Sequence, residues 1–501
     1  MAHPADLIES LEDTRERLLE AAEGWRPWSD AGTSDRDASA RNLLQYLALR
    51  RQDLRELQDP LVELGLSSLG RCEGHVQASV DAVLTALDAL ANHQSATRNG
   101  PPPPIDFAAS RRLLTLRTDA LLGPAPGGRP TRIMVTMPSD AARDAAAVRD
   151  MLHAGMNCMR INCAHDTPSE WRAMVENLRA AEHDTRRRAR AVVDLPGPKL
   201  RTGALAREGG SDHSGGYLRL RIGDRLVLAR ETNADASGEP SLPRITCSIE
   251  EAFTATRPGH HVWFDDGKLG GVVESVDPNA IELRITSAKP SGSKLRAGKG
   301  INLPDASLDI DLLGAHSHDA LEFAADCADI VGLSFVSRAR EVERVHRQLD
   351  QRGRPDIGIV LKIETRRAFA HLPGLLLAAL SGERPAGVMI ARGDLAVECG
   401  YERLAEVQEE ILWLCQAAHL PVIWATQVLD QLARTGRPSR AEITDAAMAV
   451  RAECVMLNKG PRIVEAIAVL DDILRRMEKH QRKKRPLLPR LSVSDYEHAL
   501  P

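Results

Sequence analysis

The strongest constraint on the fold is a series of eight short apolar runs that starts at residue 132, with longer amphipathic segments between them. This alternation is typical of βα units around a parallel sheet. The runs lie at 132–136, 158–161, 189–194, 330–335, 357–363, 387–390, 421–425 and 454–457. Eight such units close a barrel, so the sequence predicts an α/β fold with a (β/α)8 TIM barrel.

Helix signals fall between the predicted strands, as this fold requires. Capping-box patterns start at Thr167 and at Ser439, each followed three residues later by a glutamate, and each predicts the start of a helix. Gly155 predicts the end of an earlier helix. The boundary signals therefore support the barrel.

Three other segments differ from the barrel region in their hydrophobic pattern and composition. More than a hundred residues separate the third run from the fourth, and their short strand-like runs predict a small β-barrel domain inserted after barrel strand three. Residues 1 to about 95 have helical periodicity, and the prolines at 101–104 end that block. We expect a helical N-terminal extension and linker at 1–130, barrel at 131–203 and 298–480, the inserted domain at 204–297 and a basic tail at 481–501.

The charge and cysteine patterns exclude several classes of protein. The 65 basic and 70 acidic residues balance, so the basic excess of a nucleic-acid-binding protein is absent. The eight cysteines include no CxxC pair, which indicates reduced thiols rather than disulfides or zinc. The sequence begins without a signal-peptide pattern and contains no apolar run long enough for a membrane span. We expect a cytoplasmic protein with no membrane partner.

Charged residues collect where the predicted barrel strands end, which is where barrel enzymes carry their chemistry. Lys362 and Glu364 lie two residues apart after an apolar run, so their side chains share one face of a strand. Glu364 and Asp394 are oxygen ligands suited to Mg²⁺ or Mn²⁺. Taken alone, a Lys362–Glu364 ion pair that neutralises buried charge is an equally good interpretation.

Eight segments resemble pyruvate kinase, in the same order and over residues 131 to about 478: MRINCAHD, VVDLPGPKLRTG, GKGINLPD, LSFVSRAREV, VLKIET, VMIARGDLAVE, PVIWATQVLDQL and RPSRAEITDAAMAV. The resemblance implies a barrel with a lid-like β domain. It also implies phosphoryl transfer from phosphoenolpyruvate to ADP, giving pyruvate and ATP in glycolysis.

The resemblance also implies roles for individual residues. Lys362 would stabilise the phosphoryl group in transit, Thr426 would act near the enolate carbon, and Glu364 and Asp394 would bind magnesium. The Gly393–Asp394 backbone would hold the substrate carboxylate. The remaining matches are Arg160 and Arg201 on the phosphate, Ser334 as a substrate contact, and Asn162, His165, Arg201 and Lys299 on the nucleotide side.

The monovalent-cation site departs from the family pattern. Asn162 and Asp194 match two potassium ligands, but Ala164 stands where the family has a serine oxygen. Lys199 stands where many members have glutamate, and a tethered ammonium can replace a bound cation. Only ten residues are lysine against fifty-five arginine, and Lys199 is the first lysine of the chain. We therefore expect potassium not to be required; Lys199 as ordinary surface charge is the alternative.

Further departures leave other functions open. The loops at 136–140 and 458–461 differ from the family pattern. We expect the family's C-terminal effector domain to be missing, because only a short basic tail follows the last barrel helix in this sequence. A metal-dependent lyase or aldolase acting on a pyruvate enolate and a non-catalytic metabolite sensor are the alternatives to the kinase. We expect a homo-oligomer, in which the extension either contributes subunit contacts or is a solvated appendage.

Overall fold

The computed structural model describes residues 4–26, 34–92, 101–206, 216–230, 242–247, 249–308, 310–483 and 485–486. A closed barrel of parallel strands lies at its centre, and the predicted (β/α)8 fold is confirmed. The strands are β1 (Arg132–Thr136), β2 (Cys158–Asn162), β3 (Arg190–Leu195), β13 (Ile330–Leu333), β14 (Gly358–Ile363), β15 (Ala386–Ala391), β16 (Val422–Val428) and β17 (Cys454–Leu457). β1 pairs with β17 and closes the ring.

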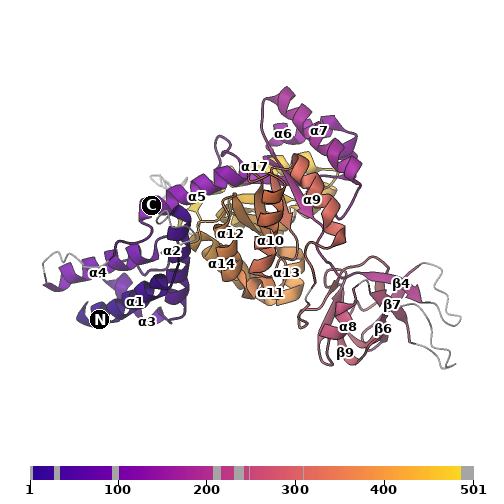
Figure 1. Ribbon diagram of the computed structural model, residues 1–501, viewed down its shortest axis with the longest axis horizontal. Coiled ribbons are helices and arrows are strands. Elements are labelled where there is room, and N and C mark those ends of the chain that lie inside the picture. The colour runs from indigo at the N-terminus through magenta and orange to yellow at the C-terminus, as the bar shows by residue number, and fades with distance from the viewer. Residues whose placement is uncertain are drawn as a thin grey trace, which may run out of the picture.

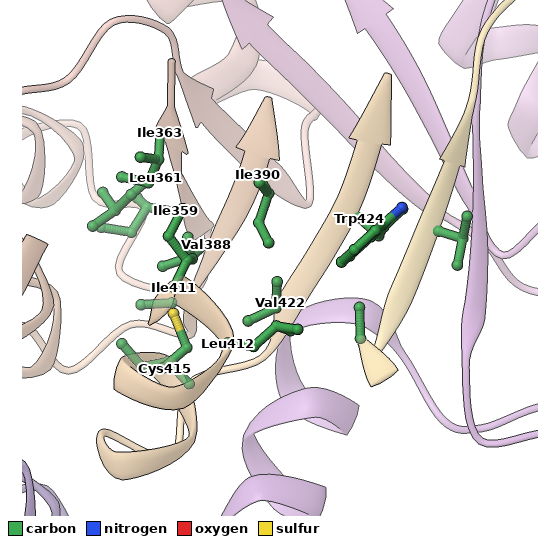
Figure 2. Packing of buried hydrophobic residues seen from close by; sticks show 14 of the residues in the cluster. Ile359, Leu361, Ile363, Val388, Ile390, Ile411, Leu412, Cys415, Val422 and Trp424 are labelled. Carbon is green, nitrogen blue, oxygen red and sulfur yellow. The ribbon is translucent and has the colours of Figure 1, made fainter. Parts of the chain in front are cut away.

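The barrel strands are apolar on both faces because each faces a different core. Along β14, Ile359 and Leu361 point outward and pack with Ile411 of helix α14 (Leu404–Ala417), as Figure 2 shows. Val360 between them faces the interior of the barrel, where it packs with Met389. Because side chains alternate, Lys362 and Glu364 follow Val360 on the inner face and reach the carboxyl end of the barrel.

Helices surround the barrel, and their ends follow the predicted signals. Capping boxes start α7 (Pro168–Thr185) at Thr167 and α16 (Arg440–Met448) at Ser439, and Gly155 ends α6 (Ala145–Ala154) in a left-handed conformation. The other helices between the barrel strands are α9 (Ala315–Cys327), α10 (Ala339–Gln351), α11 (Arg366–Ala370), α12 (Leu372–Ser381), α13 (Arg392–Cys399), α15 (Asp430–Thr435) and α17 (Ile463–Glu478). Short 3-10 turns lie at Ser139–Ala142, Tyr401–Arg403 and Ala449–Arg451.

The N-terminal extension is helical, as predicted, and lies against one side of the barrel (Figure 1). Its helices are α1 (Pro4–Glu23), α2 (Asp35–Arg50), α3 (Arg55–Glu63), α4 (Val76–Asn92) and α5 (Phe107–Leu122). The end of α5 closes the amino-terminal end of the barrel, where Leu121 and Leu122 pack with Met134 and Ile330. α2 docks through Asn42, whose amide donates 2.9 Å to the carbonyl oxygen of Ala417.

The inserted domain is a β structure on the opposite side of the barrel from the extension (Figure 1). A seven-stranded sheet has the order β12-β8-β9-β10-β6-β7-β4, and β5 pairs with β11 in a separate sheet. The described residues of this inserted domain therefore form no closed ring of strands, unlike the predicted small β-barrel. The elements are β4 (Thr202–Ala206), β5 (Leu218–Leu220), β6 (Arg225–Ala229), β7 (Arg244–Cys247), α8 (Glu251–Ala255), β8 (His261–Phe264), β9 (Leu269–Asp277), β10 (Ala280–Ser287), β11 (Ser293–Leu295) and β12 (Ile301–Asn302). We call this domain the lid; its own core is separate from that of the barrel.

Two further predictions concern the whole chain. All eight cysteines are free thiols. In the parts of the chain that the structure describes, no helix is sufficiently long and apolar to cross a membrane.

The predicted tail begins with β18 (Gln481–Arg482) and β19 (Arg485–Pro486), and its residues 487–501 lie outside the described part.

Candidate active site

A cavity of about 260 Å³ lies at the carboxyl end of the barrel, beside the base of the lid. Its lining brings together ten residues predicted from the sequence: Arg160, Asn162, His165, Lys199, Arg201, Ser334, Lys362, Glu364, Asp394 and Thr426. They come from strands and loops far apart in the chain. The barrel therefore gathers cations, carboxylates and hydroxyls around one space.

Lys362 is the buried cation of the site and is 6% exposed. Its Nζ lies 2.7 Å from Ser334 Oγ, 3.0 Å from Asp194 Oδ2 and 3.2 Å from Glu364 Oε1. Burial acts to lower the pKa of Lys362, but the two carboxylates outweigh burial and the pKa is raised. A permanent positive charge is thus fixed at the cavity wall.

Asp194 forms ion pairs both with the ammonium of Lys362 and with the guanidinium of Arg160. Arg160 donates to Asp194 Oδ2 from Nε at 2.8 Å and from Nη2 at 2.6 Å. Burial acts to raise the pKa of Asp194, but Arg160 and Lys362 outweigh it, so the pKa is lowered and the carboxylate is ionised. The close approach of Asp194 requires glycine at 332, since a Cβ there would lie 2.1 Å from Asp194 Oδ1.

Glu364 directly follows β14, and Asp394 lies in the first turn of α13 after the neighbouring strand β15; both line the cavity and form an all-oxygen donor pair. The backbone N–H of Phe335 donates 2.6 Å to Glu364 Oε2 and orients that carboxylate. Burial raises the pKa of Glu364, and the negative charge of Asp394 raises it further. Two like charges facing one space fit a hard divalent cation, which would relieve their repulsion while water or substrate oxygens complete its shell. Within the described ranges, no cluster of three or more metal-ligating side chains occurs.

Lys199 lines the same cavity as Asn162 and Ala164. Its Nζ is 2.7 Å from Asp394 Oδ1 and 3.7 Å from Asp266 of the lid, so it pairs with a carboxylate of the divalent pair. The ammonium does not contact Asp194, whose cationic partners are Arg160 and Lys362. Its side chain is only 20% exposed, which argues against ordinary surface charge.

Thr426 occupies a strained turn at the end of β16. Its φ is +65°, a conformation that β-branched residues rarely adopt, and Gln427 follows with φ +57°. The Thr426 hydroxyl is buried without a hydrogen-bond partner among the described residues. A Cβ added to Gly393 would touch this side chain at 3.9 Å, so the two positions adjoin. An unpaired hydroxyl held in strain at a cavity is typical of a functional group.

The predicted nucleotide-side residues divide into two places. Asn162, His165 and Arg201 line the cavity, and burial together with the charges of Lys459 and Arg201 lowers the pKa of His165. Lys299 is absent from the lining and instead lies 3.1 Å from Asp265 in the lid. The cavity lining is therefore rich in basic side chains, whereas Lys299 lies in the lid and pairs there with Asp265.

Comparison with known proteins decides the family. The family model "Pyruvate kinase, barrel domain" matches residues 128–461, more than half of the chain. The chain belongs to the pyruvate kinase family. It is 31% identical to a pyruvate kinase of Thermococcus litoralis over 70% of both chains, and 32% identical to one of Agrobacterium vitis over 72% of this chain and 70% of that one. A pyruvate kinase of Mycobacterium tuberculosis is 30% identical over 71% of this chain and 72% of its own length.

The predicted membership of the pyruvate kinase family and the barrel fold are thus confirmed, and the protein is an enzyme of that family. The matched region includes the strand ends that supply the cavity. Helices α1 to α5 precede it. The extension therefore lies outside the family match, as do residues 462–501.

Several residues of the site escaped the sequence interpretation. Phe335 orients Glu364 through its backbone and has φ +62°. The side-chain amide of Asn302, in the strand where the lid returns to the barrel, donates to Asp394 at 3.3 Å and to Glu398 at 3.1 Å. Arg392 lies within the segment VMIARGDLAVE, but no sequence signal shows that it holds the Thr426 turn.

Proposed function

We propose that the protein is a pyruvate kinase that transfers the phosphoryl group of phosphoenolpyruvate to ADP, the pyruvate-forming step of glycolysis. In this reaction the phosphorus–oxygen bond of phosphoenolpyruvate breaks and a new one forms to a β-phosphate oxygen of ADP. The enolate that remains takes up a proton at carbon and becomes pyruvate. The observation that carries the proposal is the convergence of Lys362, Thr426 and the Glu364–Asp394 pair on one cavity.

The chain's own residues supply positioning and charge. The ammonium of Lys362 and the guanidinium of Arg160 would face the phosphoryl group, where negative charge is redistributed during transfer. Ser334 Oγ, 2.7 Å from Lys362 Nζ, would keep the ammonium aimed at the substrate. The Gly393–Asp394 amides at the start of α13 would hold the substrate carboxylate. The unpaired Thr426 hydroxyl would help deliver the proton to the enolate carbon.

Glu364 and Asp394 would hold Mg²⁺, or Mn²⁺ in its place. When bound, the divalent cation supplies positive charge that neutralises the phosphate oxygens. The donor set supports this assignment because both groups are carboxylates and face the same cavity. With a divalent cation bound, Lys199 would need another acceptor in place of Asp394, and Asp266 of the lid lies 3.7 Å from its Nζ.

We further propose that the reaction does not require potassium. Ala164 offers no side-chain oxygen, and Lys199 brings an ammonium into the cavity that also contains Asn162. Asp194, the other matching ligand position, is already neutralised by Arg160 and Lys362. These features support the proposal that side chains of the protein, rather than a bound potassium ion, supply the positive charge in this cavity.

The test is pyruvate formation from phosphoenolpyruvate and ADP with Mg²⁺, in sodium buffer free of potassium and in the same buffer with potassium added. We expect similar turnover in both. Turnover only with potassium would retain the kinase and reject the role of Lys199. Absence of turnover in both buffers would reject the kinase.

A further inference from the structure

The lid has a surface on which basic residues collect without acidic ones. The segment 283–304 contains five basic residues and no aspartate or glutamate, and four of the ten lysines of the chain lie within 268–299. The balance of charge over the whole chain therefore conceals a local excess of positive charge. Part of this excess lies on the two-stranded ribbon of β5 and β11, in the lid that projects from the barrel (Figure 1).

The β5–β11 ribbon has one apolar face and one basic face. Leu218, Leu220 and Leu295 belong to the apolar face and are buried in the core of the lid. Arg219 and Lys294 alternate with these leucines, are exposed, and lie directly opposite each other in the register of the two strands. Like charges opposite each other on paired strands destabilise a sheet. A bound anion would relieve this repulsion.

Tyr217 lies among the cations of the basic face. The ammonium nitrogen of Lys294 is 4.4 Å from the centre of its ring, and the guanidinium carbons of Arg219 and Arg296 are 5.8 Å and 5.6 Å from it. The tyrosine is half-buried, so part of its side chain is open to a ligand. We define the basic face as Tyr217 together with the four exposed cations Arg219, Arg221, Lys294 and Arg296.

None of these four cations has a carboxylate partner among the residues that the structure describes. Asp224, in the turn after β5, accepts the backbone N–H of Arg221 at 2.7 Å. In the seven-stranded sheet of the lid, by contrast, Arg225 and Arg284 share the carboxylate of Glu274 at 3.0 Å and 2.9 Å. The positive charge of the basic face is therefore available to an anion from outside the chain.

We propose that the basic face binds single-stranded nucleic acid, with phosphates on its four cations and a base stacked against Tyr217. Proteins that bind single strands combine cations that follow the phosphates with aromatic side chains on which bases stack, and the basic face contains both. It shares no residue with the lining of the active-site cavity, so the proposal does not depend on the proposed function.

Two observations favour this partner over other polyanions. Ile222 is the one large apolar side chain that is strongly exposed in the described part of the lid, whereas attachment to a membrane surface requires a broad apolar face. The carboxylates of an acidic protein segment would pair with the cations but would leave the ring of Tyr217 unused. A nucleic acid strand has a group for each of them.

The test is a fluorescence anisotropy titration of a labelled oligouridylate of about 12 nucleotides with the full-length protein. We expect saturable binding that weakens between about 50 mM and 200 mM salt, because phosphate contacts release counterions. Arg219→Gln combined with Lys294→Gln should weaken binding roughly tenfold or more. Both side chains are exposed and repel each other, so the variant is expected to fold.

The matched control is Arg225→Gln combined with Arg284→Gln, which removes the same charge from the lid and leaves the basic face intact. Its affinity for the oligouridylate should be close to that of the wild-type chain. Tyr217→Leu tests the stacking and should weaken binding about fivefold or more while the salt dependence is retained.

Four results would overturn the proposal. The first is no saturable binding up to about 100 µM protein at low salt. The second is equal weakening in the two double variants, which would assign the effect to the net charge of the lid. The third is full affinity in Tyr217→Leu together with equally tight binding of polyglutamate, as an acidic protein segment would give. The fourth is binding to phosphatidylserine vesicles without binding to the oligouridylate, which would identify a membrane surface as the partner.

Discussion

Arg392 holds the backbone of Thr426, with its Nη2 donating 2.6 Å to the Thr426 carbonyl oxygen. Its Nε donates 2.8 Å to the carbonyl oxygen of Ala425, and its Nη2 is 2.8 Å from Asp445 Oδ2. The guanidinium also lies 4.8 Å from the centre of the Trp424 ring. One side chain thus stabilises the left-handed turn that presents the Thr426 hydroxyl to the cavity.

Substitution of Arg392 by lysine should lower kcat with a smaller effect on the KM for phosphoenolpyruvate. Lysine keeps the charge but cannot hold two carbonyls and a carboxylate in one plane, so the Thr426 hydroxyl moves. A displacement of about 1 Å can cost on the order of 10²-fold in rate. Steady-state kinetics provide the measurement, and Arg462→Gln, an exposed arginine paired with Glu465, should leave both constants unchanged. A kcat of Arg392→Lys equal to that of the wild-type chain would show that the Thr426 turn keeps its conformation without the guanidinium.

The local sequence pattern was sufficient to predict the barrel strands and many of the residues at their carboxyl ends. Each strand is apolar on both faces, and alternation along β14 carries Lys362 and Glu364 from Val360 to the mouth. The partners of Lys199 could not be predicted in this way. Lys199 and Asp394 are 195 residues apart, and they meet only because the segment after β3 folds across the mouth of the barrel toward α13.

The same limit applies where the lid and the extension join the barrel. Asn302 reaches Asp394 from the last lid strand, and Trp413 meets Arg50 from another domain. Hydrophobic periodicity encodes the faces of single elements but not the angle at which two elements meet. Contacts that one polar side chain makes across such a junction can therefore be identified only from the three-dimensional structure.

Substitution of Lys362 by methionine should lower kcat by about 10²–10³-fold while binding of phosphoenolpyruvate is largely retained. The ammonium is proposed to act mainly on charge that develops during transfer, and loss of one such group typically has this size. The variant also leaves Asp194 and Glu364 without a shared cation, so thermal unfolding must be measured in parallel. A folded variant with wild-type turnover would contradict the assigned role.

Replacement of Lys199 by glutamate together with Ala164 by serine should make the enzyme potassium-dependent. The serine supplies a missing oxygen, and the glutamate removes the tethered ammonium and adds a negative charge that a monovalent cation would balance. We expect potassium to stimulate turnover about tenfold or more in this variant and hardly at all in the wild-type chain. Ala164→Ser alone is the control and should stay insensitive. Equal rates with and without potassium in the double variant would reject the proposed substitution of charge.

Glu398 should make the junction between lid and barrel less stable as the pH rises. Burial, reinforced by the charge of Asp394, raises the pKa of Glu398 to about 7. Its folded pKa lies above the unfolded value, so the contribution is complete below pH 4.5 and is lost as the pH rises to about 7. Between pH 5 and 8 the loss is on the order of 3 kcal/mol. Melting temperatures of Glu398→Gln should fall less over this range, with Glu402→Gln as an exposed control; identical pH profiles would contradict the shift.

His419 should make the docking of the extension sensitive to acid. Its Nε2 lies 2.9 Å from the carbonyl oxygen of Gly74, which only accepts, so Nε2 carries the proton of the neutral ring. Burial, together with the charge of Arg117, lowers the pKa of His419 to about 3. The neutral ring therefore stabilises the folded protein fully above pH 6.5, and this stability is lost as the pH falls from 6.5 toward 3.

Substitution of His419 by asparagine tests this interface, since asparagine tolerates the φ of +54° at that position. At pH 5 the wild-type protein should have lost about 2 kcal/mol relative to pH 8 through this group. The variant should be less stable at pH 8 but show a smaller decrease in melting temperature on acidification. His183→Asn, at a side chain that is 92% exposed, should follow the wild-type pH profile. A variant that loses as much stability in acid as the wild-type chain would mean that other groups cause the acid sensitivity.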